Sequence, residues 1–354
     1  MGEEEERWNQ KKQSLIDEIA DRLINGDLAT KIQAAREIRS MIRNRNSSGK
    51  IRVKFAGVGV IQPLVLMLCS QHHDAREVSL LALLNLSSRN ERNKEQIVTC
   101  GAIPPLVKLL KFQNTSNLRE LATAAILTLS SAPNNKSVIA NSGAIPLLIQ
   151  ILSCGTIQGR VDAVTILHNL TAINKQEPPI VLDATVALPL INLLKECKKS
   201  SKFADKTTGL INFVSKSHEG MLAITKAEDG ILTLVETIED GSLVSTEHAV
   251  DVLLELCMSS RSKYRELILN EGAIPGLLRL TVDGTHEAQN KARLLLDLLR
   301  ESAPEKRLSS SVWEKMVHEI AARVDGSGNT VETAKILLQD MVQRSMNMAS
   351  SYTP

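Results

Sequence analysis

The feature that most constrains this chain is a ten-residue pattern that recurs at a nearly constant interval. Its clearest copies are Gly101-Ala-Ile-Pro-Pro-Leu-Val-Lys-Leu-Leu110, Gly143-Ala-Ile-Pro-Leu-Leu-Ile-Gln-Ile-Leu152 and Gly272-Ala-Ile-Pro-Gly-Leu-Leu-Arg-Leu280. Weaker copies begin at residues 59, 186 and 230. The residue before each leucine-rich core falls at 63, 105, 147, 189, 233 and 276, so the period is 42 to 44 residues. Such a period predicts stacked similar units instead of the roughly two or three separate domains that the chain length suggests.

A second pattern keeps the same period and predicts the helices of each unit. Its copies are Ala82-Leu-Leu-Asn-Leu-Ser87, Ala125-Ile-Leu-Thr-Leu-Ser130, Ile166-Leu-His-Asn-Leu-Thr171 and Leu210-Ile-Asn-Phe-Val214. Each unit is expected to hold a short helix ending at a glycine, a second helix opening at Ala-Ile-Pro, and a longer third helix. Glycine suits the left-handed turn after a helix, and proline suits a first helical turn. No unit buries its apolar faces alone, so the fold is predicted to be an all-α solenoid.

The two ends of the chain are expected to cap this stack. Residues 1–54 are predicted to form an N-terminal helical cap, with a hairpin over 8–43 that turns at Asn25-Gly26 and carries an apolar stripe through Leu15, Ile19 and Leu23. The repeats are predicted to occupy 55–302, with C-terminal capping helices over 303–348 and a disordered tail over 349–354. We expect one continuous domain.

One unit departs from the pattern. Residues 174–185 contain Pro178-Pro179 within the expected short helix, and Thr185 stands where neighbouring units have glycine. The solenoid is therefore expected to be irregular in this unit.

Composition restricts the possible partners. The 42 Lys and Arg residues nearly balance 40 Asp and Glu, and aromatic residues make up 2% of the chain, so neither nucleic acid binding nor base stacking is favoured. No apolar run is long enough for a transmembrane helix, so membrane insertion is not expected. Five cysteines without a Cys-x-x-Cys pair predict reduced, buried thiols and a cytoplasmic and/or nuclear location.

The repeats resemble armadillo repeats, and most closely those of plant U-box/armadillo proteins. The resemblance covers about residues 55–302 and is closest in Glu271-Gly-Ala-Ile-Pro-Gly-Leu-Leu-Arg-Leu-Thr-Val-Asp-Gly-Thr-His-Glu-Ala-Gln-Asn-Lys-Ala292 and Ala249-Val-Asp-Val-Leu-Leu-Glu-Leu-Cys257. It implies a right-handed superhelix whose third helices line a concave groove for protein partners. The first 55 residues carry no Cys-Pro-Ile signature of a U-box, so ligase activity in this chain is not expected.

The importin-α branch of the same fold provides a comparison for the groove. There, a Trp and an Asn four residues later on the third helix hold an extended peptide. The equivalent Trp positions here are Leu81, Ala124, Thr165, Thr208, Asp251 and Arg293. The equivalent Asn positions are Asn85, Thr128, Asn169, Asn212, Glu255 and Asp297. Because no tryptophan is present at these positions, a role as a nuclear transport receptor is not favoured.

Two features of this predicted groove have open alternatives. The three asparagines could bond an extended backbone, or they could bridge neighbouring helices. Near the C-terminal end, the acidic group of Glu247, Asp251, Glu255 and Asp297 could bind a basic segment, or Arg293 and Lys291 could neutralise it internally. The candidate residues are Leu81, Asn85, Thr128, Thr165, Asn169, Thr208, Asn212, Glu247, Asp251, Glu255, Arg293 and Asp297.

Two basic stretches of the sequence carry the charge opposite to that of the acidic group. They comprise Arg36, Arg39, Arg43, Arg45, Lys50, Arg52 and Lys54, and Lys195, Lys198, Lys199, Lys202 and Lys206. Either stretch could bind acidic or phosphorylated peptide, or could simply be solvated.

Catalytic patterns are absent from the sequence. His72-His73 is expected in an interhelical turn, and no carboxylate or cysteine is identified at metal-ligand spacing from a histidine. Gly155-Thr-Ile-Gln-Gly159 does not continue into a phosphate-binding loop. No cofactor is expected. The predicted function is that of a non-enzymatic adaptor that binds a partner protein in the groove. The alternative is a substrate-recognition component acting with a separate ubiquitin ligase.

Overall fold

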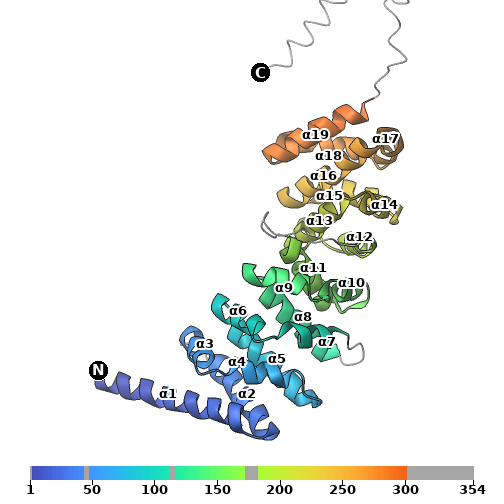
Figure 1. The fold of residues 1–354 in the computed structure, drawn as a ribbon. Coiled ribbons are helices and arrows are strands. Elements are labelled where there is room, and N and C mark those ends of the chain that lie inside the picture. Colours follow the sequence, from blue (N-terminus) through green and yellow to red (C-terminus); the bar gives the residue numbers. More distant parts are fainter. Residues whose placement is uncertain (1, 44–47, 112–115, 172–181, 301–354) are drawn as a thin grey trace, which may run out of the picture. The chain divides into compact units, whose positions relative to one another are not determined.

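The computed structural model describes residues 2–43, 48–111, 116–171 and 182–300 (Figure 1). These residues form nineteen α-helices and two short 3-10 helices, and no strand occurs among them. Residues Met1–Leu299 form one compact unit. The prediction of an all-α fold is confirmed.

An antiparallel pair of helices opens the chain. Helix α1 (Gly2–Asn25) and helix α2 (Leu28–Arg43) are joined at the predicted turn. Ile16 and Ile19 of α1 are buried, whereas Leu15 is 43% exposed. Ile19 and Leu23 are thus buried as predicted, and only the first residue of the predicted stripe was wrong, because Ile16 instead of Leu15 faces the core.

Six successive helix triplets follow this pair, in the order predicted for the repeats (Figure 1). They are α3 (Ser48–Gly57), α4 (Ile61–Met67) and α5 (His73–Ser87); α6 (Glu91–Thr99), α7 (Ile103–Leu110) and α8 (Ser116–Ser130); η1 (Pro133–Asn135) with α9 (Lys136–Ala140), α10 (Ala144–Cys154) and α11 (Ile157–Thr171); η2 (Ala184–Val186), α12 (Ala187–Glu196) and α13 (Lys202–Ser215); α14 (His218–Lys226), α15 (Gly230–Asp240) and α16 (Leu243–Ser259); and α17 (Arg261–Asn270), α18 (Ala273–Asp283) and α19 (His286–Leu299).

The turn before the second helix explains the recurring glycine. Gly59, Gly101, Gly143 and Gly272 all adopt left-handed backbone, with φ between 76° and 83°. A side chain in this conformation would crowd its own carbonyl, which glycine avoids. In the fifth triplet Asp229 adopts the left-handed conformation instead, with φ of 55°.

The fourth triplet begins irregularly, as predicted. The described residues before α12 form only the 3-10 turn η2, and the Asp183 side chain accepts a hydrogen bond of 2.8 Å from the Thr185 amide. Thr185 lies within this turn, at the place where the third triplet has the left-handed Gly143. Pro178-Pro179 lies outside the described residues.

The triplets share one core. Buried apolar side chains form a single cluster that extends from Ile16 to Leu299, and Leu106 and Leu148 of the second helices lie within it. The stack therefore buries apolar faces that no triplet could bury alone, which is the basis of solenoid stability. The predicted capping helices over 303–348 lie outside the described residues.

Buried asparagines of the first helices connect successive triplets. The Asn93 amide donates to the carbonyls of Arg52, at 3.3 Å, and Leu86, at 2.9 Å. Asn135 makes the equivalent pair of bonds to Lys94, at 3.2 Å, and Leu129, at 3.1 Å. Both carbonyls that each amide satisfies lie in the previous triplet. One is near the end of its third helix, and the other is in its first helix, 41 residues before the asparagine. These bonds help to set the register between triplets.

Composition led to two expectations, one about the cysteines and one about membrane insertion. All five cysteines are free, but Cys69 and Cys154 are exposed, so the prediction that the thiols are buried was wrong for these two. Cys257 is buried, and burial raises its pKa to about 11. Within the described residues no individual helix combines the length and apolarity of a membrane span; Pro133–Ala140 and Ala144–Cys154, bent by 87°, meet that standard only as a pair.

Candidate functional site

The third helices form a continuous row, which we call the third-helix row. Helices α5, α8, α11, α13, α16 and α19 contact one another in chain order, and α2 contacts α5. Each helix of the row packs against its own second helix and against the helices before and after it, except that α19, the last described one, has α16 as its row neighbour. The equivalent residues of successive third helices are therefore brought to equivalent places along the row, as the repeat pattern predicted.

Most candidate residues lie at least partly exposed on this row. Those that are half-buried are Leu81, Asn85, Thr128, Thr165, Asn169, Asn212, Glu247, Asp251 and Glu255. Arg293 and Asp297 on α19 are exposed. Thr208 is 0% exposed, and its hydroxyl donates to the Ala204 carbonyl at 2.8 Å. Thr208 is thus a core residue, so its assignment to the binding surface was wrong.

The three asparagines of the row already use their amide groups within the protein. The Asn85 amide donates to the carbonyl of Leu81 in its own helix, at 2.6 Å. Asn169 donates to the Ser130 hydroxyl of the preceding third helix at 3.1 Å, and the Asn212 amide lies 3.3 Å from Nδ1 of His248. These contacts favour the alternative in which the asparagines bond neighbouring groups of the protein.

The threonines of the row are also satisfied locally. The Thr128 hydroxyl donates to the Ala124 carbonyl, and the Thr165 hydroxyl donates to the Val161 carbonyl, each at 2.9 Å. Such bonds to the carbonyl four residues earlier are usual for threonine within a helix. Nζ of Lys206 on α13 also donates to the Thr165 hydroxyl at 3.2 Å, which ties two helices of the row together.

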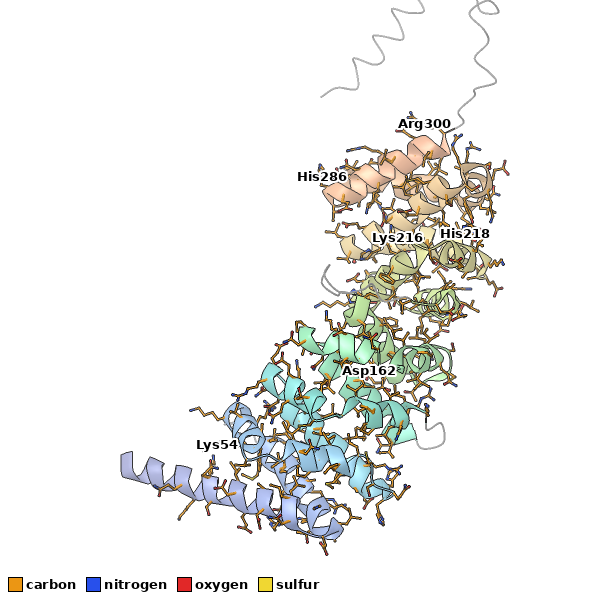
Figure 2. The ribbon with its side chains drawn as sticks, viewed as in Figure 1. Lys54, Asp162, Lys216, His218, His286 and Arg300 are labelled. Carbon is orange, nitrogen blue, oxygen red and sulfur yellow. The ribbon has the colours of Figure 1, made fainter. Side chains whose placement is uncertain are left out.

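Two lysines pair with Asp251 and Glu255, two members of the acidic group. Nζ of Lys216 lies 3.0 Å from Asp251 Oδ2 and 2.8 Å from Glu255 Oε1 (its position at the end of α13 is labelled in Figure 2). Nζ of Lys291 on α19 lies 3.0 Å from Asp251 Oδ1. Burial opposes ionisation of Asp251, but the hydrogen bonds from the two lysines outweigh it and hold the Asp251 pKa below its usual value. The internal-neutralisation alternative is therefore favoured for Asp251 and Glu255.

The pairing differs in detail from the sequence expectation. Lys291 contributes as expected, but Arg293 donates to Asn290 Oδ1 at 3.3 Å and to the Thr281 carbonyl at 3.4 Å. The expected contribution of Arg293 was therefore wrong. Lys216, which the sequence analysis missed, is separated from Asp251 by 35 residues. The sequence feature that could have identified Lys216 as a neighbour of the row is its position four residues, or about one helical turn, after the candidate residue Asn212.

Two half-buried histidines lie beside Gly209 of α13. A Cβ atom placed on Gly209 would meet His248 Nε2 at 3.4 Å and His168 Cδ2 at 3.6 Å. Burial lowers the pKa of both histidines, and the charge of Lys206 lowers that of His168 further. Both imidazoles are thus favoured in the neutral form. Their surroundings are consistent with packing between helices of the row.

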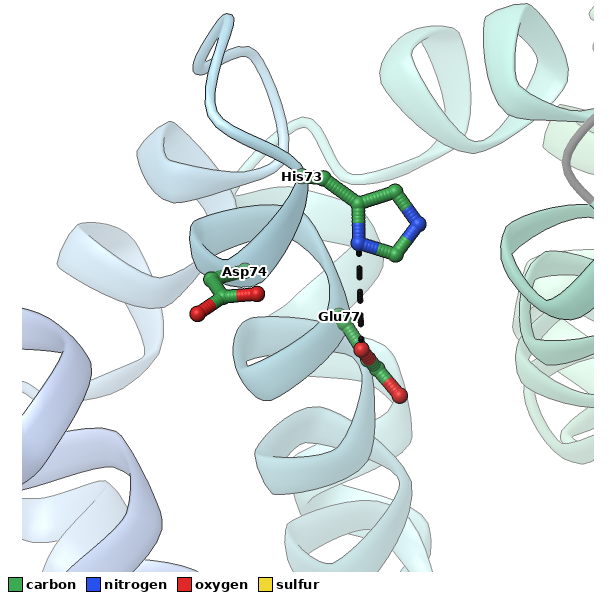
Figure 3. A group of neighbouring side chains, drawn as sticks. All are labelled: His73, Asp74 and Glu77. Carbon is green, nitrogen blue, oxygen red and sulfur yellow. Dashed lines mark ion pairs between the residues drawn. The ribbon is translucent and has the colours of Figure 1, made fainter.

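A group with metal-ligand spacing occurs at the start of α5 and was missed from the sequence. The ligand atoms of His73, Asp74 and Glu77 all lie within 4.8 Å of one another (Figure 3). His73 opens α5 instead of lying in a turn, and its Nδ1 is 3.8 Å from Glu77 Oε2. Asp74 also pairs with Arg36 at 3.5 Å, and Glu77 accepts from the Asn117 amide at 2.7 Å. Because these contacts already occupy both carboxylates, we assign no metal here.

The basic stretch over residues 195–206 is largely engaged within the protein. Lys195 pairs with Asp229 at 2.8 Å, and Lys199 pairs with Glu236 at 3.4 Å. Lys206 donates to Thr165 as described above. These contacts favour the solvated, internally paired alternative for this stretch.

Comparisons with known proteins agree with the repeat architecture. The family described as Kinesin-associated protein (KAP) matches residues 38–221, just over half of the chain. The chain belongs to this family of helical repeat proteins. U-box domain-containing protein 17 of Arabidopsis thaliana is 39% identical over 276 residues, which are 77% of this chain and 37% of that protein. U-box domain-containing protein 45 of the same plant is 27% identical over 172 residues, or 48% of this chain and 21% of that protein.

A solved structure supports the fold independently. An engineered protein superposes with a TM-score of 0.63 at 20% identity, covering 90% of this chain and 76% of that protein. The armadillo-repeat prediction is confirmed by the helix triplets together with these relatives. The chain spans less than two fifths of the length of either plant relative, and its match to the first covers most of the armadillo-like region.

Proposed function

We propose that this chain is a non-enzymatic adaptor that binds a partner protein along the third-helix row. The observation that supports this role is the row itself, in which six consecutive third helices contact one another and keep polar, partly exposed side chains at equivalent positions. An extended partner segment crossing these helices would meet one such set of side chains in each repeat. Solenoids commonly use surfaces of this kind for binding.

The proposed partner is a protein and not a nucleic acid. The charges of the chain nearly balance, and its aromatic content is 2%, which offers little for base stacking. The internal pairing of Asp251 with Lys216 and Lys291 also argues against a basic peptide as the main ligand of α16. We therefore expect the partner to be recognised mainly through polar contacts at the middle of the row.

A second candidate function is substrate recognition for a ubiquitin ligase on another chain. The 39% identity to a U-box domain-containing protein favours it, because the match covers 77% of this chain. In this case the row would bind the protein to be modified, and a separate chain would recruit the ubiquitin-charged enzyme. Both candidates use the same surface and differ in the consequence of binding.

Proximity labelling or pull-down with the full chain tests the binding surface. Thr128→Arg places a bulky charge on the row, and Gln150→Arg places the same group on the exposed face of the second helix α10. We expect the first substitution to release the partner and the second to leave it bound. Equal retention of the partner by both variants would remove the row from the proposal.

A ubiquitin-transfer assay separates the two candidates and tests the assignment as a non-enzyme. The purified chain with charged conjugating enzyme is expected to produce no ubiquitin chains. Ubiquitin transfer by the chain alone would contradict the non-enzymatic assignment. Modification of the captured partner only when a second ligase chain is added would favour substrate recognition over simple scaffolding.

A further inference from the structure

An arginine-rich face on helix α2 stands apart from the core. Arg36, Arg39, Ser40 and Arg43 line a cavity of about 300 Å³. Their spacing of three and four residues places them along one side of the helix. The buried residues of α2 are Ala34, Ala35, Ile38 and Ile42, which occupy the other side. We call these four cavity-lining residues the arginine face.

An ion pair connects the arginine face to the third-helix row. Nη2 of Arg36 lies 3.5 Å from Oδ2 of Asp74, in the first turn of α5. Asp74, Leu81 and Asn85 are separated by seven and four residues, so they lie along the same side of α5. Helix α2 also packs against α5 much as one third helix packs against the next. The arginine face therefore continues the exposed side of the row by one helix.

The charge of the arginine face is poorly compensated. Its ion pair with Asp74 is exposed, with 54% and 66% of the two side chains accessible, and such pairs contribute little. Nε of Arg39 is buried without a hydrogen-bond partner. Within the described part of the chain, Arg43 makes no ion pair. Among the described residues, the ion pair of the arginine face is thus the exposed one between Arg36 and Asp74. On α16, by contrast, Asp251 is paired with two lysines.

Guanidinium groups in this arrangement suit carboxylates on an extended chain. A guanidinium can hold a carboxylate through two parallel hydrogen bonds. Arg39 and Arg43 are separated by four residues, which is about 6 Å along the helix axis. Same-side residues of an extended strand are separated by about 6.6 Å. Two acidic side chains at alternate positions of a strand can therefore contact Arg39 and Arg43 together.

We propose that the arginine face is a docking site for an extended Asp/Glu-rich segment of the partner protein. This inference rests on the proposed function, because it assigns the chemistry of one end of the same binding surface. The acidic segment lies along α2, and the residues beyond it turn to cross the row over α5 and α8. The row thus begins with an electrostatic contact, which fixes the direction and register of the partner.

Fluorescence anisotropy with the full chain tests this assignment. The probe is a labelled peptide of alternating Glu and Ser, and its matched control has Gln in place of Glu. We expect the Glu peptide to bind and to weaken as salt is raised, and the Gln peptide to bind at least about tenfold more weakly, as loss of a charge-assisted contact requires. Equal binding of the two peptides would overturn the proposal.

Charge substitutions locate the site. Arg39→Gln with Arg43→Gln removes two charges and is expected to lower affinity for the Glu peptide by about tenfold or more. Arg43→Glu alone, at an exposed position, provides a second variant if the first is poorly folded. Lys108→Glu with Lys111→Glu changes two exposed lysines at α7 and should leave binding unchanged. Losses of equal size in both sets would show a nonspecific charge effect and overturn the site.

Two further probes test the class of ligand. A phosphoserine peptide without Glu that binds far more tightly than the Glu peptide would replace the carboxylate assignment with a phosphopeptide site. Single-stranded RNA binding with the same affinity would show general attraction of polyanions, and would also overturn the proposal. If Thr128→Arg releases the partner while the arginine variants bind it normally, the adaptor function stands and only the docking site fails.

Discussion

The buried Asn135 offers the sharpest test of how the triplets are held in register. Its side chain is 2% exposed, and its amide bonds two carbonyls, at 3.2 Å on Lys94 and 3.1 Å on Leu129. Asn135→Ala removes both hydrogen bonds and leaves two carbonyls without that donor. With each bond contributing about 0.5–1.5 kcal/mol, we expect the free energy of unfolding to fall by about 1–3 kcal/mol.

The neighbouring Asn134 provides a matched control. It is exposed, and its amide donates one hydrogen bond of 2.7 Å to Glu95 Oε1, also in the preceding triplet. Asn134→Ala removes the same atoms and is expected to change the free energy of unfolding by less than about 0.5 kcal/mol. Comparing Asn135→Ala with Asn134→Ala therefore separates the effect of burial on stability from the effect of the change in residue type.

Urea denaturation followed by circular dichroism measures the two free energies, and amide hydrogen exchange locates the effect. Because solenoid stability depends on contacts between neighbours, exchange in Asn135→Ala should increase most in α6, α8 and α9. Losses for Asn135→Ala and Asn134→Ala that agree within about 0.5 kcal/mol would refute the reasoning, as would a uniform rise in exchange along the chain.

Three other substitutions test separate parts of the structure. Leu148→Ala, at a position with 0% exposure, should cost about 2–5 kcal/mol in urea denaturation, and a loss below about 1 kcal/mol would place this leucine outside the core. Gly143→Ala should lower the melting temperature with a cost of about 1 kcal/mol from backbone strain, since no atom lies within 4 Å of the added Cβ; an unchanged melting temperature would contradict a requirement for left-handed backbone. Asp251→Asn should destabilise the fold at pH 7. Because the folded-state pKa of Asp251 lies below the unfolded value of about 3.9, this difference should disappear as the pH falls through the folded pKa, and a difference that persists in acid would exclude the ion pairs with Lys216 and Lys291 as its cause.

Much of the architecture was predictable because it depends on local chemistry. Apolar residues at spacings of three and four specify amphipathic helices, and a glycine such as Gly101 specifies where the chain turns left-handed. The irregular fourth triplet was likewise predictable from Thr185. By contrast, the bonds of Asn93 and Asn135 to the previous triplet span 41 residues and became visible only in the structure.

The candidate binding surface was less predictable because it depends on contacts between residues about 35 to 40 positions apart. Lys216 reaches Asp251 across 35 residues, and Arg36 reaches Asp74 across 38. Thr208 is buried although its counterparts on neighbouring helices are not. These outcomes follow from the rotation and register of one helix against the next.

The repeat period, the helix triplets and their turns follow from interactions within one or two helical turns, and these are written in the order of the amino acids. The ion pairs of Asp251 on α16 and the weakly compensated arginine face on α2 follow from packing between helices. Because one residue turns a helix by about 100°, the rotation of each helix decides which of its charged side chains reach a neighbour. For this reason a charged cluster visible in the sequence becomes largely an internal ion-pair network at one end of the row and an exposed, positively charged surface at the other.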